Sequence, residues 1–72
     1  MKSTMSYRIT DAKDGFQVRA TTPSEALVAV INHCVAEGLR VVHTQEDYDT
    51  TTFFYVDPDD DKLRAIVVRE SW

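Results

Sequence analysis

One stretch of sequence, TPSEALVAVINHCVAEG at residues 22–38, decides the fold. Thr22 suits the N-cap position of a helix, a proline follows at the first helical position, and Glu25 completes a capping box. Gly38 can adopt the left-handed conformation that ends a helix. The segment therefore predicts a single helix over residues 23–37.

The apolar side chains of this helix predict the face that packs on a sheet. Six of them recur at helical spacing: Ala26, Leu27, Val30, Ile31, Cys34 and Val35. The opposite side includes Val28, Asn32 and His33 and lacks the charges usual on an exposed helix. We expect Val28 and Asn32 to contact a partner or a second subunit.

Strand-forming segments flank the helix on both sides. They are residues 5–11, 16–21, 39–45, 50–56 and 63–70. The first two are joined by a turn at Asp14-Gly15, which makes them a hairpin. The order ββαβββ predicts a single α+β domain over residues 1–72. In it one helix packs on one face of a four- to five-stranded, mainly antiparallel sheet.

Acidic residues concentrate in loops. If each connection reverses the chain, the loops at 11–15 and 57–62 share one end of the sheet. The loop at 46–50 and both termini then share the other end. Two of these loops hold seven of the twelve acidic residues: Glu46, Asp47, Asp49, Asp57, Asp59, Asp60 and Asp61. We expect them to dock on lysines and arginines of a partner, or else to be solvated turns.

The uncovered sheet face is the second expected interface. Phe53 and Tyr55 are expected on it, interleaved with arginines, and Trp72 adds a large apolar group at the end of the chain. Aromatic residues and arginine are enriched at protein interfaces. We therefore expect these three residues to contact a partner or to form a homodimer.

No catalytic, cofactor or metal site is expected. His33 and Cys34 are adjacent on the helix and point about 100° apart, so they cannot pair as base and nucleophile. Loop 57–62 fails as a calcium loop, since its sixth position is Lys62 and its twelfth is Val68. With two glycines the chain cannot build a glycine-rich phosphate loop. The protein is not expected to be an enzyme.

Charge and cysteine content limit location and partners. A single cysteine, no export signal and no long apolar run predict a cytoplasmic protein that does not enter the membrane. The formal net charge of −4 argues against direct nucleic-acid binding.

In overall layout the chain resembles small phage-encoded inhibitors of bacterial defence, anti-CRISPR proteins among them. The resemblance spans the whole chain and consists of the ββαβββ order, the length, Ala20-Thr21-Thr22 before the helix and Phe53-Phe54-Tyr55 in the fourth strand. It implies a non-catalytic protein-binding module that blocks a surface of a host complex such as a CRISPR effector. Two alternatives stay open. One is a dimeric module that binds a small ligand or partner at its subunit interface, and the other is a sheet-based nucleic-acid binder.

Overall fold

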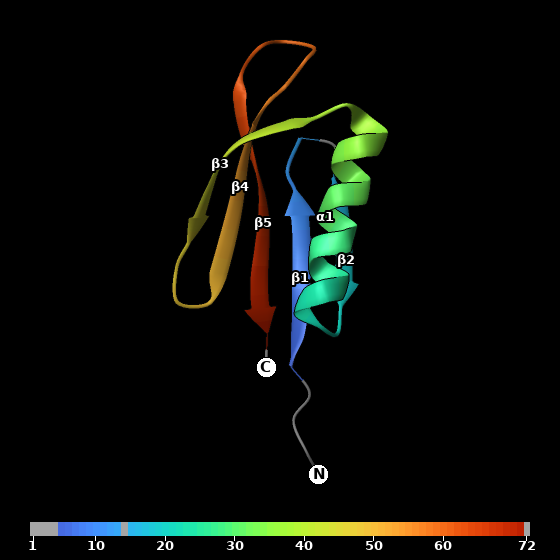
Figure 1. Cartoon of the computed structure of the whole chain (residues 1–72), viewed down its shortest axis with the longest axis vertical. Coiled ribbons are helices and arrows are strands. Elements are labelled where there is room, and N and C mark those ends of the chain that lie inside the picture. Colours follow the sequence, from blue (N-terminus) through green and yellow to red (C-terminus); the bar gives the residue numbers. More distant parts are fainter. Residues whose placement is uncertain (1–4, 14, 72) are drawn as a thin grey trace.

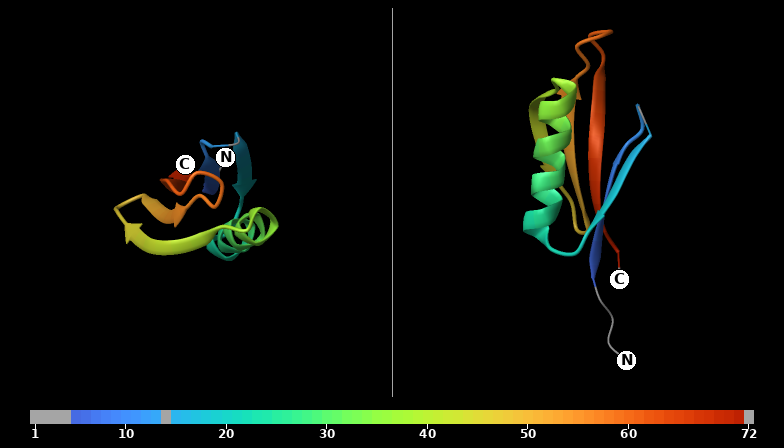
Figure 2. Two further views of the ribbon diagram at one scale, coloured as in Figure 1. Left: turned by 90° about the horizontal axis from the view of Figure 1, so that it is seen from above. Right: turned by 90° about the vertical axis from the view of Figure 1, so that its right-hand side faces the viewer.

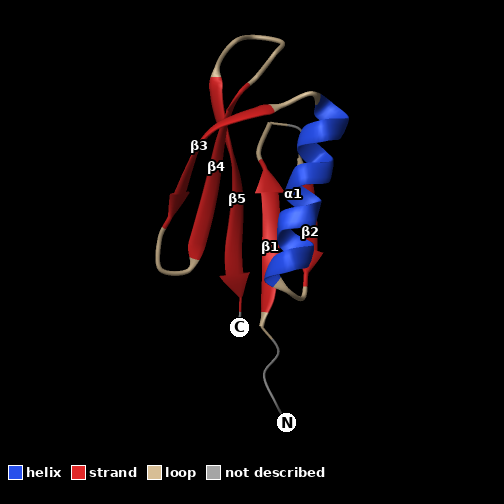
Figure 3. Ribbon diagram, in the orientation of Figure 1, coloured by secondary structure: helices blue, strands red, loops and turns tan. Residues whose placement is uncertain are grey.

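The computed structural model describes residues 5–13 and 15–71. Its elements are β1 (Ser6–Asp11), β2 (Phe16–Ala20), α1 (Pro23–Glu37), β3 (Arg40–Glu46), β4 (Thr50–Val56) and β5 (Leu63–Ser71) (Figure 3). The predicted α+β class and the ββαβββ order are confirmed, and each strand boundary lies within one residue of its predicted place. No helix in the described part of the chain is long and apolar enough to cross a bilayer.

The five strands form one open sheet in the order β2-β1-β5-β4-β3, and every neighbouring pair is antiparallel. The last strand therefore lies between the first and the fourth. This order brings the β1–β2 and β4–β5 loops to the same end of the sheet, as Figure 1 shows. The ammonium of Lys13 in the first loop lies 2.9 Å from the carboxylate of Asp57 in the second.

Local chemistry sets both ends of α1. The Thr22 hydroxyl accepts a hydrogen bond from the backbone N–H of Glu25 at 3.1 Å. The Glu25 carboxylate in turn accepts one from the N–H of Thr21 at 3.3 Å, one residue earlier than in the usual capping box. At the other end Gly38 has a φ of 67°, in the left-handed region that glycine adopts at low cost.

The helix packs on one side of the sheet and covers only part of it. It contacts β1 and β2, whereas β3 and β4 lie beside it (Figures 1 and 2). Its buried residues are Ala26, Val30, His33 and Cys34. The predicted packing face was therefore partly wrong. Leu27 and Ile31 are 50% exposed and Val35 is 77% exposed, because the helix is rotated and shifted towards β2.

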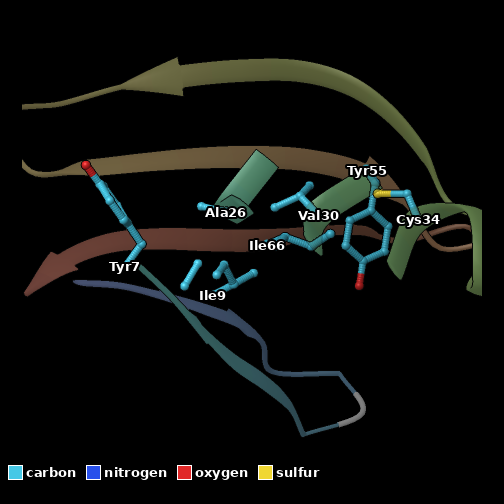
Figure 4. Packing of buried hydrophobic residues seen from close by; sticks show 8 residues of the cluster. Tyr7, Ile9, Ala26, Val30, Cys34, Tyr55 and Ile66 are labelled. Carbon is cyan, nitrogen blue, oxygen red and sulfur yellow. The ribbon is translucent and has the colours of Figure 1, made fainter. Parts of the chain in front are cut away.

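The core between helix and sheet is small. It comprises Tyr7, Ile9, Ala20, Ala26, Val30, Cys34, Tyr55 and Ile66, most of which Figure 4 labels. Tyr55 is fully buried, so its predicted place on the uncovered face was wrong. It pairs with Arg64 of β5 and Val41 of β3, and this register turns its ring towards the helix. Phe53, two residues earlier, shares that face and is half-buried, so its predicted place on the uncovered face was also wrong. Phe54 faces the uncovered side.

Candidate functional site

An apolar groove runs along the helix side of the sheet, between α1 and strands β3 and β4. It has a volume of about 300 Å³ and is lined from the helix by Leu27, Ile31 and Val35, and from the sheet by Val41 and Phe53. All seven residues of β3 are exposed, which leaves the outer wall of the groove open. Three of the six helix residues that the periodicity assigned to the core therefore line a surface that nothing in the described chain covers.

Carboxylates line the continuation of this groove towards the start of the helix. A second hollow of about 350 Å³ shares Leu27 and Phe53 with the first. Glu46, Asp49 and Glu70 line it, and none of the three forms an ion pair with another described residue. The groove is thus apolar at one end and acidic at the other. The sequence pattern singled out two of these carboxylates but missed Glu70, which lies within a strand.

The groove-lining helix residues were missed because two stripes on α1 have the same spacing. Positions 26, 30, 33 and 34 repeat every three to four residues as regularly as the purely apolar stripe does. His33 belongs to the buried stripe. Because its ring is polar, the sequence pattern did not assign it to the packed face. A hydrogen-bonding partner on a neighbouring strand would have indicated that His33 is buried. Asp11 on β1 is that partner.

Asp11 holds a buried polar cluster beneath the C-terminal half of α1. It accepts hydrogen bonds from the Tyr55 hydroxyl at 2.7 Å and from the Lys13 backbone N–H at 3.1 Å, and its Oδ2 lies 3.0 Å from His33 Nε2. Burial favours the neutral acid, but the hydrogen bonds from Tyr55, His33 and Lys13 outweigh it and keep the pKa of Asp11 below its ordinary value. Phe16 stacks on the imidazole at 3.8 Å between ring centroids.

This cluster corrects one expectation. His33 was placed on the outer side of the helix, but it is 7% exposed and faces Asp11. Asp11, the last residue of β1, is 2% exposed. Cys34 does lie on the packed side, where burial, and then the charge of Asp11, raise the pKa of its thiol. A thiol with a raised pKa is a poor nucleophile at neutral pH, which suits a packing role.

Asp57 forms a second buried carboxylate centre, in the β4–β5 loop. Its Oδ1 lies 2.9 Å from Lys13 Nζ, and its Oδ2 accepts a hydrogen bond from Arg64 Nε at 2.8 Å. The backbone N–H of Asp59, then Lys13, and also Arg64 hold the pKa of Asp57 at about 2, against the opposing effect of burial. The prediction that Asp57 docks on a partner was wrong, because the side chain is buried and already neutralised by two cations.

The remaining predicted residues lie at the surface. Six of the predicted carboxylates are exposed: Glu46, Asp47, Asp49, Asp59, Asp60 and Asp61. Of these, Asp59 contacts Lys13 and Asp60 contacts Arg64, so both are partly neutralised. Val28 and Asn32 are exposed and border a hollow of about 420 Å³ on the β2 side of the helix. Trp72 and Asp14 lie outside the described residues.

No group of three or more His, Cys, Asp or Glu side chains within the described ranges is arranged to hold a metal ion. No family model, curated protein or solved structure matches the chain. The features of the molecule that bear on its function are the groove, its acidic end and the charges on the two faces of the sheet.

Proposed function

We propose that this protein is a non-catalytic protein-binding module. Its groove receives an apolar segment of a partner protein that carries lysine or arginine at one end. The observation that carries the proposal is the exposure of Leu27, Ile31 and Val35 along one wall of a groove whose other wall holds Val41 and Phe53. Contiguous apolar surface rimmed by polar residues is typical of protein interaction sites.

The energetics favour an apolar occupant. Full burial of a Val, Leu or Ile side chain contributes roughly 1.5–3 kcal/mol. Three such helix residues can therefore offset a substantial part of the loss of freedom on association. Their spacing along α1 suits a segment that lies parallel to the helix, as amphipathic helices do in hydrophobic grooves.

The carboxylates set the direction in which the occupant lies. Glu46, Asp49 and Glu70 lie at the end of the groove near the start of α1. A basic residue of the partner placed there is attracted, whereas an acidic residue is repelled, so charge provides orientation and selectivity. Two copies that packed groove to groove would lack such a basic residue, since the residues that line the groove include no lysine or arginine.

A module of this kind acts by occupying a surface of a larger assembly. We extend the proposal to a phage or mobile-element inhibitor that blocks a host complex such as a CRISPR effector. The layout described above supports this role. A cytoplasmic location is part of the proposal, and the single cysteine, buried as a free thiol at Cys34, supports it.

The proposal is tested with two synthetic peptides that differ only in charge. Both carry leucines at helical spacing, and one ends in lysines where the other ends in glutamates. Titration into isotopically labelled protein should shift the methyl resonances of Leu27, Ile31 and Val35 with the lysine peptide only. Glu46→Gln combined with Glu70→Gln should weaken that binding several-fold, because it removes two of the three carboxylates.

Two results would overturn the proposal. One is that neither peptide shifts the groove methyls, or that both bind equally. The other comes from light scattering: a stable dimer that Ile31→Lys converts to a monomer would show that a second copy occupies the groove. Val28→Lys serves as the matched control, because Val28 is equally exposed but lies outside the groove.

A further inference from the structure

Three arginines form a row across the face of the sheet that α1 leaves bare. Arg8 on β1 is the direct partner of Arg19 on β2 and of Arg69 on β5. The neighbours of Arg8, Tyr7 and Ile9, are buried beneath the helix, so the alternation of side chains turns Arg8 to the opposite face. None of the described helices and strands covers that face (Figure 2).

The arginine row destabilises the fold when no anion is bound to it. Like charges directly opposite each other on neighbouring strands repel. Arg8, Arg19 and Arg69 form no ion pair with another described residue, whereas Lys13 and Arg64 each contact two carboxylates. The described strand residues that share the bare face include no Asp or Glu. The face is therefore positive in a chain whose net charge is negative.

Two hollows lie along the row, and each is lined by two of the arginines. One, of about 240 Å³, is lined by Arg8, Arg19 and Gln17. The other, of about 340 Å³, is lined by Arg8, Arg69 and Thr10. Each hollow thus combines two cations with a neutral hydrogen-bond donor, and Arg8 belongs to both. This arrangement suits a series of regularly spaced anionic groups.

We propose that the row Arg8, Arg19 and Arg69 binds the phosphate backbone of single-stranded nucleic acid. Neighbouring strands are about 4.8 Å apart, so the row spans roughly 10 Å, the scale of two or three consecutive phosphates. Arginine pairs bidentately with phosphate, and threonine and glutamine side chains are common phosphate contacts. Phe54, which lies 5.8 Å from His43 between ring centroids, shares this face and offers a surface for base stacking.

The proposal accounts for the charge of the chain. Most of the carboxylates occupy the loops, the buried centres and the groove, and none belongs to a described strand residue of the bare face. Glu25, at the start of α1, borders a hollow that Arg19 also lines. Net charge describes the whole surface, but contacts with phosphate depend on the local face, since salt screens charges beyond about 8 Å at physiological ionic strength. The contacts are to phosphate, so the binding carries little sequence preference.

The test measures the anisotropy of a fluorescent oligothymidylate over a series of salt concentrations. For single strands, the slope of the logarithm of the binding constant against the logarithm of the salt concentration is about −0.7 per neutralised phosphate. Three phosphate contacts therefore predict a slope near −2. Arg8→Gln should lower the affinity several-fold and reduce the slope by about 0.7. Arg40→Gln is the matched control, because it removes one charge from the same face at the β3 edge.

Each alternative outcome overturns the proposal. Absence of binding at low salt would do so directly, and an equal loss on Arg40→Gln would show diffuse attraction in place of a row. Competition by a polyglutamate peptide at lower concentration than the oligonucleotide would assign the face to acidic proteins. Ile31→Lys, which alters only the groove, should leave oligonucleotide binding intact, so this proposal and that of the groove can fail separately.

Discussion

Asp11 and Asp57 are the two buried carboxylates among the described residues. Both follow or end a strand at the same end of the sheet, and both are at most 2% exposed. A buried carboxylate is tolerated when donors surround it, and here Tyr55 and His33 serve Asp11 while Lys13 and Arg64 serve Asp57. Lys13 bridges the two centres, since its N–H bonds Asp11 and its ammonium bonds Asp57.

Asp57 makes stability depend on pH in the acid range. Its folded pKa of about 2 lies below the ordinary 3.8, so the unfolded chain takes up the proton first. The stabilisation from Asp57 is complete above about pH 4 and is lost as the pH falls towards about 2. We expect Asp57→Asn to lower the urea midpoint at neutral pH, and the difference from the wild type to shrink on acidification.

Asp47→Asn is the control for this series, because Asp47 is exposed and forms no ion pair with another described residue. Its unfolding curves should follow those of the wild type at every pH. A constant difference between Asp57→Asn and the wild type from neutral pH to about pH 2 would contradict the assignment.

At the scale of elements, α1 presents two apolar faces and packs only one of them. Its buried face holds Val30, which is 2% exposed, and its groove face holds Val35, which is 77% exposed. The helix can leave the second face open because His33 and Asp11 anchor it over β1. One face of α1 thus covers the core, and the other forms one wall of the groove.

The same substitution on the two faces of α1 tests this arrangement. Val30→Ala should lower the free energy of unfolding by roughly 1.5–3 kcal/mol, because a fully buried side chain is shortened. Val35→Ala should change it by less than about 0.5 kcal/mol, as is usual for surface positions. Urea unfolding followed by circular dichroism measures both. Equal losses would mean that the helix packs as its apolar periodicity alone suggested.

At the scale of the molecule, charge is sorted by face and by end. Carboxylates occupy the loops and the groove on the helix side, whereas Arg8, Arg19 and Arg69, which form no ion pair with another described residue, occupy the opposite face. Both surfaces lack a complementary group within the described chain, and we therefore propose each as a binding surface. A small core supplies only a few kcal/mol of net stability, so the repulsion within the arginine row is a measurable part of it.

The repulsion within the arginine row can be measured through protein stability, without a ligand. Arg8→Gln should raise the free energy of unfolding by roughly 0.2–1 kcal/mol at low salt, because Arg8 is directly opposite both Arg19 and Arg69. The gain should vanish at about 1 M salt, where charges are screened within about 3 Å. Arg40→Gln, whose strand partner is Val56, should show no such gain. A gain that is independent of salt would contradict the electrostatic cause.

The sequence by itself determined the elements. Thr22, Glu25 and Gly38 set the ends of α1 through contacts within a few residues, and the alternation of side chains set the strands, so neither depends on the rest of the fold. It also predicted that the 11–15 and 57–62 loops share one end, since antiparallel connections force that result.

The tertiary structure alone decided which residues are available to a partner. The strand order that places β5 beside β1, and the shift of α1 towards β2, follow from contacts between residues far apart in the chain. Those contacts withdraw Tyr55 and Asp57 from the surface and expose Ile31 and Val35. Burial is a property of the whole packing, and a local pattern carries no record of which of two similar faces the rest of the chain will cover.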